Sequence, residues 1–205
     1  MKTLIAIPCM DEIDVGFVQS LMDLKTVGET KTYFLSGSLI YEARERLSAM
    51  AVDNGFDHVL WLDSDMMFKP TMMLDFVSSN VDMVTGIIPA RRPPFIPCVY
   101  RKEGDKLIQM TEFDGHLTEI DGCGFGAVFM KTEILEKCFD KFKTCFMPVY
   151  GFGEDLSFCL RARELGYKIY CDPRIDFCHI GKTVITKDMW RKDVSKDKVG
   201  VKDHN

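Results

Sequence analysis

The sequence predicts an α/β fold with a Rossmann-like, mixed but mostly parallel sheet flanked by helices. Apolar segments of strand length alternate with segments of helical periodicity through the first 90 residues, which is typical of parallel sheets. The 205 residues, 46% hydrophobic and 28% charged, suit one domain with a full core. We therefore expect a single domain over 1–181, followed by a tail at 182–205.

The helix expected at 40–52 is the clearest element of the first half. Ala43, Leu47 and Ala51 recur at helical spacing. Asn54-Gly55 then provides residues that commonly end a helix. In chain order, we expect a strand at 4–7, a helix at 15–24, a strand at 33–35, this helix, a strand at 59–62, a helix from about Pro70 and a strand at 81–88.

The second half changes character after residue 90. Prolines at 93, 94 and 97 exclude a helix there, and short segments at 99–101 and 106–110 indicate a hairpin. A glycine-rich run at 122–126 precedes a strand at 127–130. Helices are expected from Thr132 to about Cys138 and from Glu154 to Leu165. Residues 182–205 alternate Lys and Asp with few apolar anchors, which indicates a mobile tail or lid.

Charge and composition exclude several classes of protein. A net charge of −5 and a pI near 5.4 argue against nucleic acid as a partner, because polyanion binding needs a clustered positive field. The apolar run at 3–7 is short and is broken by Pro8, so it is not a signal peptide. No apolar stretch has the length of a membrane span. We expect a soluble cytoplasmic protein, with a peripheral membrane role left open.

Eight cysteines occur without any Cys-x-x-Cys pair. A chain of this size has a core and needs no disulfide staples. Several of the cysteines lie in apolar runs, such as Phe158-Cys159-Leu160, where a thiol acts as a small apolar group. They are expected to be reduced and buried, which favours a reducing compartment.

Asp63 and Asp65 directly follow the apolar segment 58–62. Side chains two apart in a strand point to the same face, and ligands bind at the carboxyl ends of the strands in open α/β sheets. Two carboxylates there can converge on a hard cation such as Mg²⁺, Mn²⁺ or Ca²⁺. Acidic residues after strands are also common as turn formers and helix caps, so the pair alone leaves both interpretations open.

Glu154 and Asp155 form a second acidic pair, at the start of an expected helix. Acids at a helix N-terminus cap free N–H groups, but a carboxylate there could also take a proton from a hydroxyl group. His179 lies in an apolar stretch near the end of the domain. It is either a structural histidine or a neutral imidazole that completes a cation site.

The order of these motifs resembles that of GT-A glycosyltransferases, which use nucleotide-sugar donors. The resemblance rests on an Ile-Pro strand end, Leu-Asp-Ser-Asp, a glycine-rich strand, Gly-Glu-Asp at a helix start and a final histidine. It covers most of 3–181 and is closest to the small single-domain, family-2-like members. It implies a nucleotide-binding half at about 1–89 and an acceptor half at about 90–181.

The resemblance implies a role for each motif. Asp63, Ser64 and Asp65 match the Asp-x-Asp motif, which holds Mn²⁺ or Mg²⁺ against the donor diphosphate, and His179 matches a late histidine that supplies a third ligand in some members. Asp65 is the implied direct ligand, while Asp63 contacts the ribose or the metal.

The remaining matches concern the nucleotide and the acceptor. Residues that match nucleotide-contacting positions are Pro8, Cys9 and Asp11 in the first loop, and Arg44 in the helix before the Asp-x-Asp strand. Glu154 and Asp155 match the acidic pair near the acceptor, one of which is the base in inverting members.

The implied reaction is the transfer of one sugar, a hexose, from a nucleotide-diphosphate sugar to a hydroxyl group of a glycan, a lipid-linked molecule or a protein. The expected donor is UDP-linked, although Leu35-Ser36-Gly37-Ser38 replaces the acidic pair with which many members read uracil. Two alternatives remain: a non-catalytic glycan- or nucleotide-sugar-binding module on the same fold, and a phosphatase of the haloacid-dehalogenase type.

Overall fold

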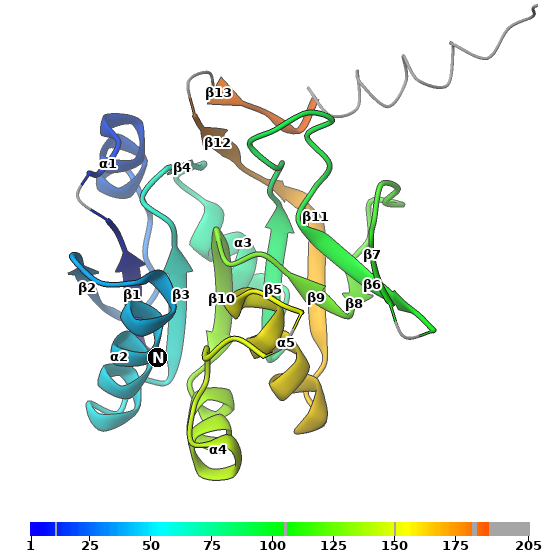
Figure 1. Cartoon of the computed structure of the whole chain (residues 1–205). Coiled ribbons are helices and arrows are strands. Elements are labelled where there is room, and N and C mark those ends of the chain that lie inside the picture. The colour runs from blue at the N-terminus through cyan, green and yellow to red at the C-terminus, as the bar shows by residue number, and fades with distance from the viewer. Residues whose placement is uncertain (11, 105, 150, 182–183, 189–205) are drawn as a thin grey trace, which may run out of the picture.

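A seven-stranded sheet in the order β2-β1-β3-β10-β5-β11-β8 forms the centre of the molecule (Figure 1). The computed structural model describes residues 1–10, 12–104, 106–149, 151–181 and 184–188. The strands are β1 (Lys2–Pro8), β2 (Glu29–Leu35), β3 (His58–Leu62), β5 (Met83–Ile87), β8 (Thr118–Ile120), β10 (Ala127–Lys131) and β11 (Ile169–Asp176).

The sheet is mixed but mostly parallel. β1 is parallel to β2 and β3, and β11 is parallel to β5, while β10 runs antiparallel between β3 and β5. β8 is antiparallel to β11 at the edge. The carboxyl ends of β1, β3, β5 and β11 therefore lie at one edge of the sheet, the upper edge in Figure 1. The predicted fold class is confirmed, although the sequence did not indicate β11 or the central place of β10.

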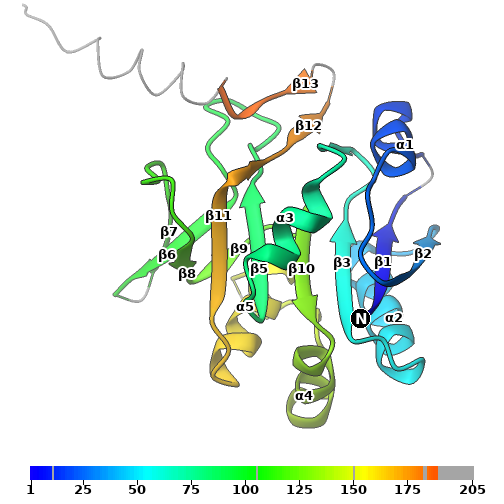
Figure 2. The ribbon, with the colours of Figure 1, turned by 180° about the vertical axis from the view of Figure 1, so that it is seen from behind.

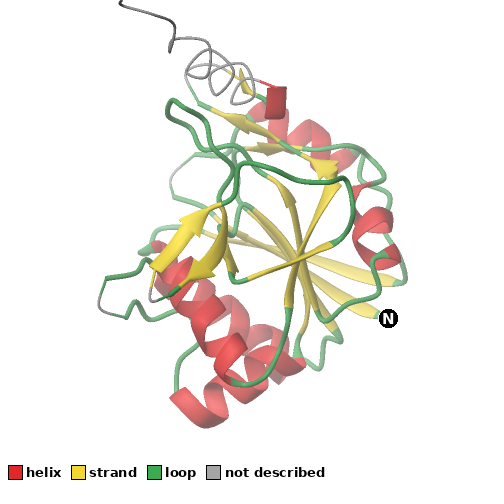
Figure 3. Ribbon diagram, turned by 90° about the vertical axis from the view of Figure 1, so that its right-hand side faces the viewer, coloured by secondary structure: helices red, strands yellow, loops and turns green. Residues whose placement is uncertain are grey.

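Helices cover both faces of the sheet. α2 (Ile40–Asp53), α4 (Glu133–Phe142) and α5 (Glu154–Glu164) lie on one face, and α1 (Val15–Met22) and α3 (Met72–Ser78) belong to the other. Figures 1 and 2 show these two layers from opposite sides, and Figure 3 shows them beside the fanned strands. Alternate residues of β1 enter the two cores, Leu4 on the α2 face and Ile5 on the α1 face.

The predicted helices and strands differ from the observed ones mainly at their ends. α1 ends at Met22 rather than Leu24, and α4 continues to Phe142 rather than stopping near Cys138. α3 begins at Met72, with Thr71 as its N-cap residue, so Pro70 precedes the helix. α5 ends as predicted before Gly166, whose φ of +89° is the left-handed conformation that glycine tolerates.

Two small sheets complete the fold. The predicted hairpin is confirmed as β6 (Val99–Glu103) and β7 (Lys106–Gln109), with β9 (Gly122–Cys123) beside β6. The other sheet joins β4 (Met66–Met67), β12 (Cys178–Ile180) and β13 (Val184–Ile185) at the upper edge of Figure 1. The predicted tail at 182–205 lies outside the described residues except for 184–188, which include β13.

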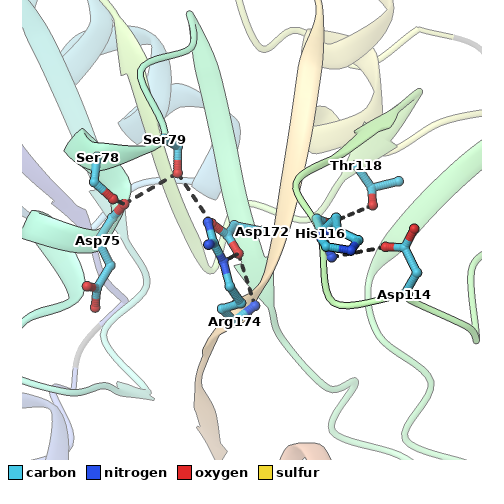
Figure 4. Close-up of polar contacts among 8 residues, drawn as sticks. All are labelled: Asp75, Ser78, Ser79, Asp114, His116, Thr118, Asp172 and Arg174. Atoms are coloured by element: carbon cyan, nitrogen blue, oxygen red, sulfur yellow. Dashed lines mark hydrogen bonds and ion pairs between the residues drawn. The ribbon is translucent and has the colours of Figure 1, made fainter.

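Polar contacts away from the upper edge stabilise β11 and a nearby turn (Figure 4). Arg174 donates two hydrogen bonds to the buried Asp172, at 2.9 and 2.6 Å, and this pairing lowers the pKa of that carboxyl group. The backbone N–H of His116 donates to Asp114 in a turn. Asp114, Asp172 and Arg174 therefore have hydrogen-bond partners within the fold.

Burial of the cysteines agrees with their expected role as small apolar groups. Six of the eight are buried, and all eight are free thiols. No helix within the described residues is long and apolar enough to cross a membrane.

Candidate functional site

A pocket of about 830 Å³ opens at the edge where the parallel strands end. Most of the predicted site residues line it: Pro8, Cys9, Arg44, Asp63, Ser64, Asp65, Glu154 and Asp155. They come from the ends of β1 and β3 and from α2 and α5. Asp11 lies outside the described residues, so its predicted contact with the nucleotide stays a prediction.

Backbone hydrogen bonds fix the Asp-x-Asp turn on three sides. The N–H of Asp63 donates to the carbonyl of Gly126 at 2.9 Å, next to β10. The carbonyl of Ser64 accepts from Asp14 at 3.2 Å, and that of Asp65 accepts from Ile180 at 2.8 Å. The turn is therefore tied to β10, to the start of α1 and to β12, elements far apart in the sequence.

Arg44 lies between the two predicted acidic motifs and contacts both. Its Nη2 donates to Asp63 Oδ1 at 2.9 Å, and its Nε lies 3.6 Å from Asp155 Oδ1. The side chain is 1% exposed, with its guanidinium carbon 5.3–5.9 Å from the ring centroids of Trp61, Phe125 and Phe146. Arg44 lines the pocket, but its observed partners are these carboxylates and aromatic rings.

The start of α5 is placed by a close approach to β9. A Cβ on Gly122 would lie 2.8 Å from Leu156 Cδ2, so the Leu156 side chain would have to move to accommodate one. The N–H of Phe125 then donates to Asp155 Oδ2 at 3.2 Å. Asp155 thus has one oxygen on the glycine-rich segment and the other facing Arg44.

Burial, followed by neighbouring charges, shifts the pKa values in this cluster. Desolvation raises the pKa of Asp155 to about 7; Arg44 opposes the shift, whereas Glu154 and Asp63 add to it. Desolvation also raises the pKa of Asp63 against the effect of Arg44. Burial disfavours the charge of Arg44, but Asp63, Asp155 and Glu154 outweigh burial and raise its pKa. At Asp155, desolvation is the largest effect and Arg44 does not offset it, so the pKa of this carboxyl group lies near neutrality.

Asp65 contacts different partners from those of Asp63. Its Oδ2 lies 2.5 Å from Arg91 Nη2 and 3.6 Å from His179 Nε2. Arg91 also donates from Nε to His179 Nε2 at 2.7 Å, and His179 Nδ1 lies 2.9 Å from the carbonyl oxygen of Pro89. The antiparallel pairing of β12 with β4 sets His179 opposite Met66, next to Asp65.

His179 is held at the side of the pocket. It is 13% exposed and is not among the pocket-lining residues, although its Nε2 faces Asp65 and Arg91. The predicted proximity of His179 to the Asp-x-Asp motif is observed, while a role as metal ligand stays a prediction.

The donor set around Asp65 fits a hard divalent cation. Asp65 Oδ1 is buried and has no hydrogen-bond partner, and the pocket lining has six acidic residues against two arginines. Carboxylate oxygens and a neutral imidazole suit Mn²⁺ or Mg²⁺. As the side chains stand, no group of three His, Cys, Asp or Glu residues within the described part of the chain could hold a metal by itself, so ligand oxygens would have to complete the coordination.

Three charged pocket residues were not among the predicted site residues: Arg91, Glu12 and Asp14. Arg91 follows β5, whose carboxyl end lies at the same edge as that of β3, and this placement could have indicated it. Asp14 caps α1 by accepting from the N–H of Gly16 at 2.7 Å, which is an ordinary capping role.

The fold is α/β, and comparison with solved structures shows that it is GT-A-like. The crystal structure of A197 from STIV is similar with a TM-score of 0.67, at 22% identity over 92% of each chain. The crystal structure of GalNAc-T7 with UDP, GalNAc and Mn²⁺ is similar with a TM-score of 0.56, at 11% identity over 88% of this chain.

These identities establish likeness of fold alone. This chain spans 43% of the length of the GalNAc-T7 chain. The sequence matches no protein-family model and no curated protein sequence.

Proposed function

We propose that the protein is a metal-dependent glycosyltransferase that moves one sugar from a nucleotide-diphosphate sugar, UDP-linked, to a hydroxyl acceptor. The observation that carries the proposal is the arrangement at the sheet edge: an Asp-x-Asp turn and an acidic helix start face one pocket from two sides. GalNAc-T7, which shares the fold, was solved with UDP and Mn²⁺, and this supports the proposed donor and cation.

The charge of the pocket supports a cation requirement. A diphosphate is anionic, and a pocket in which carboxylates outnumber arginines repels it. In the proposal, Asp65 and His179 hold the cation and Asp63 lies beside it. When bound, the cation supplies positive charge that stabilises the departing diphosphate as a Lewis acid.

In the proposal, residues of the protein bind and deprotonate the acceptor. We assign Asp155 as the base, because its pKa of about 7 suits proton transfer near neutrality. The acceptor oxygen forms a bond to the anomeric carbon as the bond from that carbon to the phosphate oxygen breaks, and Asp155 takes the acceptor proton. In this assignment Glu154 contacts the acceptor. Pro8 and Cys9, at the end of β1, would contact the nucleobase of the donor. This assignment assumes inversion at the anomeric carbon.

A thermal-shift panel tests the donor and metal together. UDP-, GDP-, CMP- and dTDP-linked sugars are each added with Mn²⁺ and with EDTA. A ligand at a hundredfold excess over its Kd stabilises the folded state by about 2.7 kcal/mol, so one nucleotide series should raise Tm only with Mn²⁺. The absence of any metal-dependent shift in the panel would contradict the proposal.

Two variants locate the effect. Asp65→Ala should lose the metal-dependent shift. Asp140→Ala should keep it, because Asp140 is exposed on α4 at the opposite end of the sheet. A retained shift in Asp65→Ala would remove this residue from the metal site. A metal-dependent shift without turnover on any acceptor would favour the non-catalytic binding module.

A further inference from the structure

Arg91 occupies the space between the two side chains that we assign to the cation. Its guanidinium contacts Asp65 Oδ2 at 2.5 Å through Nη2 and His179 Nε2 at 2.7 Å through Nε. The two contacts come from different nitrogens of the same planar group, which presents several donors in a fixed geometry. In this conformation the positive charge beside Asp65 belongs to the protein itself.

The lone pair of His179 Nε2 cannot serve Arg91 and a metal at the same time. The Nδ1 atom faces the carbonyl oxygen of Pro89 at 2.9 Å, and a carbonyl only accepts, so Nδ1 carries the proton. Nε2 therefore has the lone pair, which accepts from Arg91 Nε. A divalent cation on the same nitrogen requires this hydrogen bond to break.

Arg91 is free to leave because little covers it. Its side chain is 56% exposed and lies in the loop after β5. It also lines the same pocket as the carboxylates, so it stays close to any anionic ligand after it leaves Asp65. Asp65 Oδ1, buried without a hydrogen-bond partner, remains a second oxygen that Arg91 does not use.

We propose that Arg91 competes with the divalent cation for Asp65 and His179, and that the displaced guanidinium then contacts the donor diphosphate. In this proposal Arg91 has two anionic partners in succession, first Asp65 and then the diphosphate. The proposal rests on the metal site of the proposed function. Metal binding and repositioning of Arg91 become one coupled event, and substitution of Arg91 should have opposite effects on the two ligands.

The test measures Mn²⁺ binding in the absence of nucleotide, by electron paramagnetic resonance of free Mn²⁺. Arg91→Ala should bind Mn²⁺ about tenfold more tightly than the wild type, because the contacts of Arg91 with Asp65 and His179 no longer have to be broken. Arg91→Lys keeps the charge but cannot span both partners, so its affinity should be intermediate. Arg92→Ala removes the same charge from an exposed neighbour and should change the affinity less than about twofold.

A second measurement follows the diphosphate. With Mg²⁺ saturating, pyrophosphate should stabilise Arg91→Ala less than the wild type or Arg92→Ala in a thermal shift. In ¹⁵N spectra without metal, the Nε2 signal of His179 should move in Arg91→Ala, because its hydrogen-bond donor is gone, and Mn²⁺ should broaden it at lower concentration.

The outcomes separate the two proposals. Equal Mn²⁺ affinities for wild type, Arg91→Ala and Arg92→Ala would overturn the competition and leave the metal site standing. Unchanged pyrophosphate binding in Arg91→Ala would overturn the diphosphate contact. If Mn²⁺ binds only when UDP is present, equally to the wild type and to Arg91→Ala, the competition is overturned and the metal site stands. If neither protein binds Mn²⁺ with or without UDP, the metal site itself fails, and both proposals fall with it.

Discussion

Two arginines face the carboxylates of the pocket, and the fold holds them in opposite ways. Arg44 is 1% exposed, lies among three aromatic rings and reaches Asp63 and Asp155 from inside the core. Arg91 is 56% exposed and reaches Asp65 and His179 from a loop. A buried cation among carboxylates cannot leave without exposing uncompensated charge, whereas an exposed one exchanges with solvent and ions.

The different exposure of the two arginines indicates which carboxylate is available to a ligand. Asp63 and Asp155 are tied through Arg44 into a fixed acidic pair, with raised pKa values that desolvation explains first. Asp65 instead has an exposed partner, Arg91, that can be replaced. The i, i+2 aspartates therefore differ in role, one built into the scaffold and the other open to exchange.

The largest expected effect is on turnover, at the Arg44 cluster. Asp155→Asn keeps the size of the side chain and an oxygen that can accept from Phe125, but it cannot take a proton. We expect kcat to fall by about 10²–10⁴-fold, with metal-dependent donor binding retained. Steady-state kinetics and the thermal shift of the donor check this. Turnover at the wild-type rate would remove Asp155 from the role of base.

The next effect is on stability and tests the two arginines against each other. Arg44→Met should lower the free energy of unfolding by about 3 kcal/mol, because it leaves Asp63 and Asp155 without their cation. Arg91→Met, the same exchange at the exposed site, should change it by about 0.5 kcal/mol or less. Urea denaturation at pH 7 measures both. Equal losses would contradict the distinction between a fixed and an exchangeable arginine.

The smallest expected effect is a pH dependence of stability. The pKa of Asp155 is about 7 in the folded protein and about 3.9 in an unfolded chain. Between these values the folded state binds more protons, so this group makes the protein less stable as pH rises from about 4 to 7. Asp155→Asn removes that slope of about 2.6 kcal/mol in the free energy of unfolding between pH 5 and pH 8, so its Tm should gain on the wild type by about 5–10 °C across this range.

The pH dependence of kcat/KM tests the same titration of Asp155. As the base, Asp155 must be ionised, so kcat/KM of the wild type should rise with pH and level off above about 7. If Tm of Asp155→Asn and wild type change in parallel across this range, the titration near neutrality belongs to another group.

The fold could be predicted to a large extent because its signals are local. Periodicity gave α2 from Ile40 nearly to its last residue, and the apolar runs of β1 and β3 reflect burial on both faces. β11 was missed because Asp172, Pro173 and Arg174 interrupt its apolar pattern, and the Asp172–Arg174 pair that satisfies them is visible only in the folded chain. The place of β10 between β3 and β5 depends on long-range pairing.

By itself, the sequence determined which chemical groups are present and near which elements they lie: Asp63 and Asp65 after a strand, Glu154 and Asp155 at a helix start, and His179 late in the chain. Only the tertiary structure decided their partners. The pairing of β12 with β4 brings His179 to Asp65, and the packing of α2 on one face of the sheet brings Arg44 to both acidic motifs. Spacing along the chain cannot specify these contacts, because burial and strand pairing between distant segments set which charges meet and which stay free for a ligand.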